Sequence, residues 1–447
     1  MNTNKKHHYL FFSFLGLCSF FNAGNSNIYI QINFILISII FFISLKNKNY
    51  VAHLKTFVYQ NKISCYFFLL FILYLVFQLI PLPIKILEIF SNEKFNLLQK
   101  IESNFSFFPL SFSSTNTYFQ IINYITVFIS LLVVKMIFYN NRYIHRFYYF
   151  LAFLGALHAC LAVFLYLNGN PDFFFLSSFH YKDSSTGLFV NRTVFSIFLI
   201  FCLICGLEYL KNVVQSDLYK NRDNFFNKIY VRIFIIFITL GIITTFSKLG
   251  NFLMFLTILF YLFHNFFIKR NKNKMFSLIL ILIIFLDIFI LGFYFGGDKL
   301  VGRFMFLSDN LTIDASSRDI SRLEIISFSF NQFKNYLIFG YGAGGFENIF
   351  KLNFINSYSL FANHVHSDII EFLGEFGIFG FTFFILSFSA IFFRKSNYSF
   401  KFNLLLTIGA LIILFDFSLH IPLIQILFVI LITFSLNIKK NNFTQFD

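Results

Sequence analysis

Charged side chains are scarce in this chain, at 12% of its 447 residues, whereas soluble globular proteins carry roughly 25%. Tryptophan is absent and proline occurs only five times. Hydrophobic residues reach 57%, which excludes an ordinary soluble domain and predicts an integral membrane protein. Phenylalanine occurs 77 times, a usage typical of an AT-rich genome, so we do not interpret it as an aromatic binding platform.

The basic residues are not gathered in one place along the sequence. The formal net charge is +15, but nucleic-acid binding requires Lys and Arg concentrated on one exposed face. Here they are scattered between apolar runs, a distribution that reports membrane topology instead. We therefore expect a lipid bilayer as the surrounding medium and no nucleic-acid partner.

The cysteines give no sign of a disulfide framework or a metal site. All five lie inside apolar runs, at Cys18, Cys65, Cys160, Cys202 and Cys205. Cys202 and Cys205 form a Cys-x-x-Cys pair, but no nearby His, Asp or further Cys completes a set of zinc ligands. We predict packing roles, no disulfide, no metal and no cofactor.

The sequence predicts an all-α polytopic membrane protein, because about twelve apolar runs approach the roughly 20 residues that cross a bilayer. The first run follows Lys5 and Lys6 and lacks a clear small-x-small cleavage site, so we interpret it as an uncleaved span. The predicted spans lie near residues 9–24, 27–45, 63–81, 117–138, 147–168, 190–210, 231–247, 249–268, 276–296, 368–393, 401–418 and 421–437.

Alternate loops differ in their content of Lys and Arg. One set, which includes both ends of the chain and the loops near residues 46–62, 211–232 and 269–274, is strongly basic. By the positive-inside rule we place this set and both termini in the cytoplasm. The opposite loops, near 82–116, 169–189 and 297–367, then lie on the outer face of the membrane.

The long loop divides the chain into three parts. We expect a bundle of nine spans at 1–296, a long outer loop at 297–367 and three further spans at 368–447. A loop of this size among short connections is more often a binding element than a connector. Within it, RLEIISFSFNQFKNYLIF predicts an amphipathic helix on the outer surface.

Basic groups on the predicted outer face are unusual, because the positive-inside rule disfavours them there. The group consists of Arg192, Lys248, Arg318, Arg322 and His366. Each one alone is as well explained by a snorkelling or salt-bridged side chain at the interface. Together they favour an anionic ligand such as the diphosphate of an outer-leaflet lipid.

The stretch HVHSDIIEFLGEFGIFG, residues 364–380, contains the titratable groups that suit acid and base chemistry. An imidazole such as that of His366 can take a proton from a hydroxyl, and a neighbouring carboxylate can orient it. His364 and Asp368 are four residues apart, which favours a helix-capping pair for them. Glu371 and Glu375 follow along the same helix.

The run GYGAGGF, residues 340–346, invites comparison with a phosphate-binding loop. It lacks the Lys-Ser/Thr that such a loop needs, and no strand–helix context surrounds it. We predict instead a turn that permits close approach of two backbones.

Four passages resemble the O-antigen ligase and polymerase superfamily of bacterial envelope glycan enzymes. HVHSDIIEFLGEFGIFG resembles its His-x-His-Asn-Asp-Tyr-Leu and Glu-x-Gly motifs, with His366 on the functional histidine and Glu375 in register. SRLEIISFSFNQFKNYLIFGYGAGGF resembles its Arg-led helix, with Arg322 on the loop arginine. FSKLG resembles its Ser-Arg-x-Gly turn, and LIPLPIKIL with PLSFSSTNTYF resembles its first outer loop.

This chain departs from the family pattern at several positions. Lys248 replaces the usual Arg, which removes bidentate phosphate geometry. Ser367 and Ile369 replace the usual Asn and aromatic residue, and Arg192 falls where the family varies.

The resemblance implies a metal-independent glycosyltransferase of the bacterial inner membrane, with the long loop in the periplasm, whose donor is a polyprenyl-diphosphate-linked glycan. It implies His366 as the functional histidine and Arg322 as the loop arginine. We expect His366 to act as general base and Arg322 and Lys248 to bind the diphosphate. Arg318 or Arg192 would assist, with His364, Asp368 and Glu375 in support. The acceptor, in order of preference, is lipid A core for a ligase, another lipid-linked repeat for a polymerase, or a protein hydroxyl. A polyprenyl-glycan flippase or other transporter is an alternative from a different class, although no internal repeat favours it.

Overall fold

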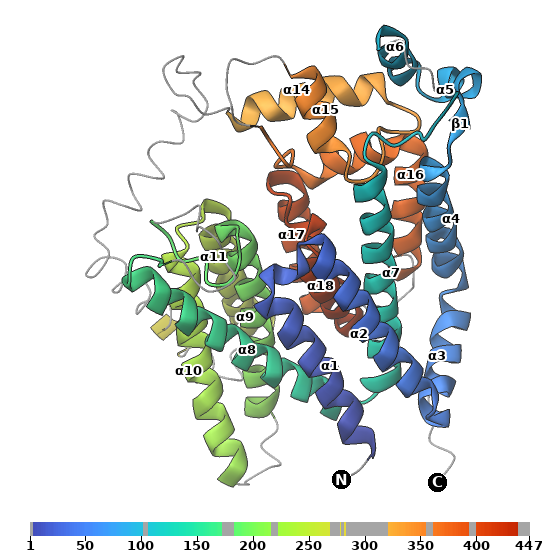
Figure 1. Ribbon diagram of the computed structural model, residues 1–447. Coiled ribbons are helices and arrows are strands. Elements are labelled where there is room, and N and C mark those ends of the chain that lie inside the picture. Colours follow the sequence, from blue (N-terminus) through green and yellow to red (C-terminus); the bar gives the residue numbers. More distant parts are fainter. Residues whose placement is uncertain are drawn as a thin grey trace.

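The computed structural model describes residues 3–101, 106–171, 183–215, 222–268, 278, 281–282, 321–354, 361–392 and 399–436. This part is almost entirely helical (Figure 1) and contains eight helices that are long and apolar enough to cross a membrane. It is therefore an all-α membrane architecture, as predicted. One short antiparallel pair of strands, β1 (Leu82–Pro83) and β2 (Phe107–Phe108), lies in the first outer loop.

Eleven of the predicted spans fall on helices, and the run at 276–296 lies almost wholly outside the described residues. Three of these helices, α1, α17 and α18, are not among the eight candidate spans, so a total of twelve stays a prediction. The helices are α1 (Thr3–Phe20), α2 (Asn27–Leu45), α4 (Lys62–Leu79), α7 (Ser114–Ile137), α8 (Asn141–Leu167), α9 (Arg192–Gln215), α10 (Arg222–Thr244), α11 (Lys248–Phe263), α16 (Asp368–Phe392), α17 (Phe400–Phe415) and α18 (Pro422–Ser435).

Helix α9 is the centre of the bundle. Its apolar stretch is 94% buried, whereas the stretches of α2 and α4 are 28% buried. Helices α8, α10 and α11 pack around it, and α18 joins it to the group formed by α1, α2 and α7. Helices α4 and α16 pack on each other beside α7 and form a second apolar cluster. The five cysteines are free thiols, with Cys202 and Cys205 fully buried in α9.

The first and last described helices meet at one end of the bundle. The ring of His8 near the start of α1 and the ring of Phe434 near the end of α18 both contact Phe138, just after α7. The helix α3 (Lys48–Gln60) lies at this same end, where the sequence predicts a basic loop. The structure thus has a helix where the sequence analysis expected a loop. Its Lys-containing, amphipathic sequence explains this, because such a helix can lie at a membrane surface.

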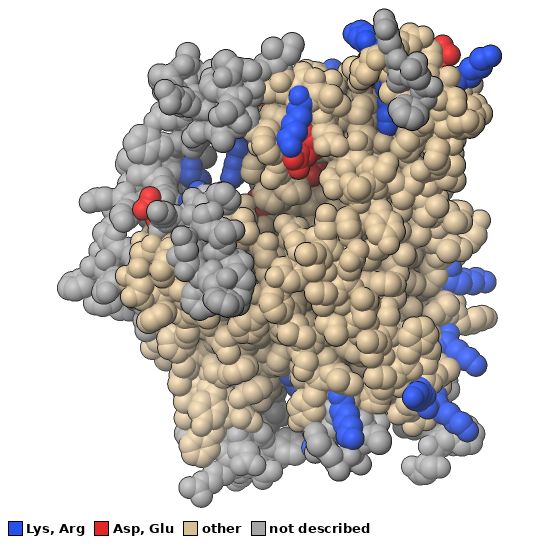
Figure 2. Space-filling view, in the orientation of Figure 1, with Lys and Arg blue, Asp and Glu red and all other residues tan. Residues whose placement is uncertain are grey.

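The opposite end carries a cap of short helices (Figure 1). It is built from α5 (Ile84–Phe90), α6 (Asn92–Lys100), α14 (Arg322–Asn335) and α15 (Phe346–Asn353). Helix α14 is the amphipathic helix that the sequence predicts. In Figure 2 the middle of the visible face is almost free of charged side chains, which gather at this cap and along the edge beside α3.

Lys94 of α6 holds the first outer loop against this cap. Its buried ammonium donates to the carbonyl oxygens of Pro109 and Ser111, both at 2.7 Å, and lies 4.7 Å from the ring centre of Phe112. The backbone N–H of Phe112 in turn donates to the carbonyl of Tyr341 at 3.0 Å. A single lysine thus fixes the segment that meets the glycine run.

The run GYGAGGF crosses α16 where that helix is kinked. Gly377 has φ +61° and ψ 179°, a conformation restricted almost to glycine, and Gly340 has φ +68°. A Cβ on Gly340 would lie 2.3 Å from the carbonyl oxygen of Glu375, and one on Gly377 would lie 2.3 Å from that of Ile338. The predicted close approach of two backbones is confirmed.

Helix α4 satisfies the carbonyl groups that this kink leaves without helical partners. Nε2 of Gln78 donates to the carbonyl oxygens of Glu375 and Phe339, at 3.0 and 3.1 Å. The hydroxyl of Tyr74 lies 2.8 Å from the carbonyl of Phe376. Buried backbone groups need such partners, so α4 determines where α16 can bend.

Candidate active site

His366 is held in an unusual backbone conformation at the end of the bundle that carries the cap. Its φ is +62°, which is strained for a residue with a Cβ. It precedes α16 by two residues, so it lies before the helix and not within its first turn. Its Nδ1 is buried without a hydrogen-bond partner, and its ring contacts Phe417 edge-on at 5.3 Å. Strain and an unsatisfied nitrogen at one residue are typical of functional sites.

Arg322 lies close enough to act electrostatically on His366. It is the first residue of α14, which starts at a capping box formed by Ser321 and Glu324. Burial, and then the positive charge of Arg322, lower the pKa of His366 to about 4. The imidazole of His366 is therefore neutral at physiological pH and able to accept a proton.

His364 forms a pair with a carboxylate, but the partner is Glu371 and not Asp368. Nδ1 of His364 lies 2.8 Å from Oε1 of Glu371, whose Oε2 accepts from the backbone N–H of Val365 at 2.8 Å. The ring stacks on Phe417 at 4.3 Å. The expected capping pair of His364 and Asp368 is wrong, because the loop leaves the helical path before α16 begins.

Asp368 is the partner of His420, a residue that the sequence analysis did not select. His420 ends the short helix η3 (Ser418–His420) between α17 and α18. Its Nδ1 is hydrogen-bonded to Oδ1 of Asp368, and the backbone N–H of Leu419 donates to Oδ2 at 2.9 Å. The carboxylate of Asp368 is therefore directed to His420.

Three buried carboxylates surround His420. Its Nε2 lies 3.6 Å from Oε1 of Glu371 and 3.6 Å from Oε2 of Glu375, in addition to the bond to Asp368. Burial alone would lower the pKa of His420, but the negative charges of Glu371 and Asp368 outweigh it and raise that pKa well above its usual value. The imidazolium form balances part of a charge that would otherwise be costly to bury.

The same atoms have the spacing of a metal site. Ligand atoms of Glu371, Glu375 and His420 lie within 4.8 Å of one another, and the carboxylate of Asp368 on Nδ1 would serve as the outer partner of a ligating histidine. A divalent ion and the Nε2 proton of His420 would occupy the same space between the carboxylates.

Glu375 links this cluster to the glycine run. Its Oε1 accepts from the backbone N–H of Gly344 at 2.8 Å, while Oε2 has no hydrogen-bond partner within the described structure. Gly344 has φ +67°, and a Cβ there would lie 2.9 Å from the side chain of Asn116. The turn therefore fixes the carboxylate that faces His420.

Arg192 and Lys248 lie together at the outer ends of two neighbouring helices. Arg192 begins α9 and Lys248 begins α11, whose cap Ser247 has its hydroxyl 3.2 Å from that of Thr193. The tight turn before Lys248 is made by Phe246, with φ +48°, and not by Gly250. Gly250 instead allows close packing, since a Cβ there would lie 2.2 Å from the hydroxyl of Ser196.

Among the basic residues predicted as ligands, Arg192 and Lys248 begin neighbouring helices, and Arg322 acts on His366 directly. Arg318 lies outside the described residues.

Asp416 is a second functional candidate that the sequence analysis did not select. Burial raises its pKa to about 6, although its hydrogen bond with Ser418 and the charge of Arg322 oppose the rise. Asp416 and His420 occur in FDFSLHIPL, where two ionisable residues interrupt an apolar region at the junction of the last two predicted spans. This interruption of the apolar sequence is the signal by which both residues could have been selected from the sequence.

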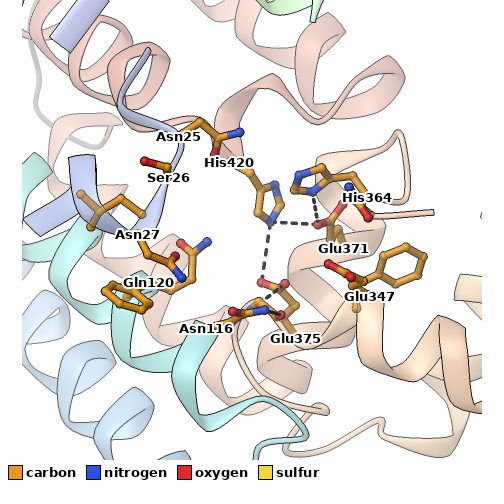
Figure 3. A pocket seen from close by; sticks show the side chains of 15 residues that line it. Asn25, Ser26, Asn27, Asn116, Gln120, Glu347, His364, Glu371, Glu375 and His420 are labelled. Atoms are coloured by element: carbon orange, nitrogen blue, oxygen red, sulfur yellow. Dashed lines mark hydrogen bonds and ion pairs between the residues drawn. The ribbon is translucent and has the colours of Figure 1, made fainter. Parts of the chain in front are cut away.

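A cavity of about 200 Å³ opens beside this cluster (Figure 3). His364, His420, Glu371 and Glu375 line one side, and residues of α2, α7 and the α1–α2 turn line the other. The site therefore combines a neutral histidine beside an arginine with a carboxylate-lined cavity on the same outer end of the bundle. This arrangement defines a multi-pass membrane protein with a site suited to proton transfer near an anionic group.

Comparison with known proteins finds a family match over part of the chain. A family model described as O-antigen ligase matches residues 233–385, a range that includes Lys248, Arg322, His364, His366 and Glu375. The match supports membership of the O-antigen ligase superfamily, as the motifs predict, and that family indicates a glycosyltransferase-like function of the ligase or polymerase type. A search of curated proteins gives no match.

Proposed function

We propose that this protein transfers a glycan from a polyprenyl-diphosphate donor to an acceptor hydroxyl on the periplasmic face of the bacterial inner membrane. The observation that carries this proposal is the position of neutral His366 beside Arg322. A proton acceptor and a permanent positive charge are the two groups that this reaction needs. The strained φ of +62° at His366 further supports a functional constraint at this residue.

In the proposed step the acceptor oxygen attacks C1 of the donor sugar. His366 takes the hydroxyl proton, the new C1–O bond forms, and the bond from C1 to the diphosphate oxygen breaks with inversion. Polyprenyl diphosphate leaves with the bonding electrons. Arg322, assisted by Lys248 and by Arg318 or Arg192, binds the diphosphate and stabilises its developing charge. His364, Asp368 and Glu375 shape the surrounding site.

We propose a ligase-like reaction, with lipid A core as acceptor, as the first choice because the matching family model is described as O-antigen ligase. A polymerase would use another lipid-linked repeat, and a protein O-oligosaccharyltransferase would use a serine or threonine hydroxyl. Deletion of the gene in its host separates these acceptors. Loss of all long glycan from lipid A indicates a ligase, whereas retention of a single attached repeat indicates a polymerase.

Complementation of the deletion with variants tests the chemistry itself. We expect His366→Ala to lower glycan transfer by about 10²- to 10⁴-fold, the usual range for a general base, and Arg322→Ala to lower it strongly as well. His53→Ala and Arg142→Ala are matched controls in α3 and α8 that should keep wild-type transfer. Wild-type transfer by both site variants, at normal membrane levels, would refute the proposal.

Metal independence is part of the proposal and has its own test. Arg322 and the other basic residues supply the positive charge at the diphosphate, so transfer needs neither a metal nor a nucleotide. Treatment of membranes with a chelator should leave the transfer rate unchanged.

A further inference from the structure

The cavity beside His364 is lined on its far side by neutral polar groups. The turn between α1 and α2 contributes Asn25, Ser26 and Asn27, and α7 contributes Asn116 and Gln120. Asn363 contributes a further amide from the loop before His364. Amide side chains offer both a donor and an acceptor, which is the combination that neighbouring sugar hydroxyls require.

One of these amides has an unmet hydrogen-bonding requirement. Oε1 of Gln120 is buried and has no partner within the described structure, although the residue lines the cavity. Asn116 is held in place because its Nδ2 donates to the carbonyl of Gly344 at 3.0 Å. A buried polar atom without a partner is costly, and a bound hydroxyl group would satisfy it.

The charges of the cavity select against an anionic ligand. Glu347, Glu371 and Glu375 all line it, and His420 and His364 are the basic side chains among its lining residues. Arg322, which suits a diphosphate, is absent from the lining and acts on His366 instead. A phosphate group in the cavity would lie close to carboxylates, whereas an uncharged ligand would avoid that repulsion.

Phe417 lies between the two sides of the site. The ring of His364 stacks on it at 4.3 Å, and the ring of His366 contacts its edge at 5.3 Å. His364 lines the cavity, whereas His366 does not. The loop of residues 364–366 therefore separates an amide- and carboxylate-lined cavity from the arginine beside His366.

We propose that this cavity is the acceptor subsite and that it binds an uncharged sugar unit through the amides of Gln120, Asn27 and Asn363. The inference rests on the proposed transfer reaction and adds the class of acceptor, a neutral glycan end rather than a phosphorylated sugar. The half-buried ring of Phe119 gives the sugar an apolar surface. Gln120 and Asn27 also place acceptor recognition outside residues 233–385.

Binding of simple sugars to the purified full-length protein in detergent tests this inference without any transfer step. The probes are methyl glucoside, methyl galactoside and N-acetylglucosamine, with glucose 6-phosphate as the charged counterpart, observed by saturation-transfer NMR. We expect at least one uncharged sugar to bind more tightly than glucose 6-phosphate. Gln120→Ala and Asn363→Ala should each weaken that binding about fivefold, as expected for loss of one hydrogen bond.

Gln99→Ala in α6 is the matched control, since Gln99 is an exposed amide outside the cavity and should keep wild-type binding. Equal binding by wild type and both cavity variants, stronger binding of glucose 6-phosphate, or no binding of any uncharged probe would overturn the inference. A different result would refute the proposed function alone: the uncharged sugar binds as expected, but the His366→Ala variant still transfers glycan.

Discussion

At the scale of single residues, the site depends on two histidines with opposite protonation. Burial and Arg322 keep His366 neutral, because they lower its pKa to about 4, while the carboxylates around His420 keep that ring charged. Sequence alone could identify His366 and Arg322 by motif. It could not pair Asp368 with His420, because 52 positions separate them and only the packing of η3 on α16 brings them together.

The lowered pKa of His366 predicts an unusual pH dependence. A general base acts in its neutral form, and His366 is neutral at every pH above about 4. We expect kcat/KM for transfer to stay level from pH 7 down to about pH 5, where a base with an ordinary pKa of about 6.5 would lose roughly 30-fold. Arg322→Gln removes a nearby positive charge, so its residual activity should show an acid limb at higher pH. An acid limb near pH 6.5 in the kcat/KM profile of the wild-type protein would contradict this prediction.

His420 should be important for stability. His420→Gln removes the positive charge that faces Asp368, Glu371 and Glu375, and leaves buried carboxylates without a counter-charge. We expect a loss of about 3–5 kcal/mol, the usual cost of breaking a buried ion pair, measured as thermal unfolding in detergent. The double variant His420→Gln/Glu371→Gln should recover part of it. His158→Gln, a buried histidine bonded to Ser19, should lose less; equal losses would refute the charge argument.

At the scale of elements, hydrophobic length predicted the helices well and their bends poorly. The predicted span 27–45 coincides with α2, and the predicted amphipathic helix is α14. The break of α16 at Gly377 lies inside an apolar run with glycines at 374, 377 and 380, and the local pattern does not show which of the three carries it. It forms because the glycine run crosses there and because Gln78 and Tyr74 of α4 donate hydrogen bonds to the freed carbonyls.

The kink at Gly377 can be tested by adding one methyl group. Gly377→Ala would place Cβ 2.3 Å from the carbonyl oxygen of Ile338 in a conformation with φ +61°. We expect a loss of about 2–4 kcal/mol from strain and displacement of the glycine run. Gly16→Ala in α1 is the control, because its Cβ would meet nothing within 4 Å, and it should be neutral or stabilise the helix by up to about 1 kcal/mol. Similar unfolding temperatures for both variants would argue against a kink at Gly377 that requires glycine.

At the scale of the whole molecule, the fold supports the prediction from loop charge that both ends of the chain lie on the same side of the membrane. The start of α1 and the end of α18 share the contact with Phe138, while the cap helices lie at the other end (Figure 1). The cavity belongs to that second end, because Glu347 of the cap helix α15 lines it. The positive-inside rule assigns the first end to the cytoplasm, and the proposed reaction requires the second to be periplasmic. Both arguments therefore need the same orientation in the membrane.

Labelling of single cysteines decides this orientation. In a background where the accessible Cys65 and Cys160 are serine, Lys100→Cys in α6 and Lys55→Cys in α3 place exposed thiols at opposite ends. We expect a membrane-impermeant maleimide to label Lys100→Cys in intact spheroplasts, and to label Lys55→Cys only after the membrane is disrupted. The reverse labelling pattern would place the His366 site on the cytoplasmic side of the membrane. It would then remove the basis for the proposed transfer at the outer leaflet.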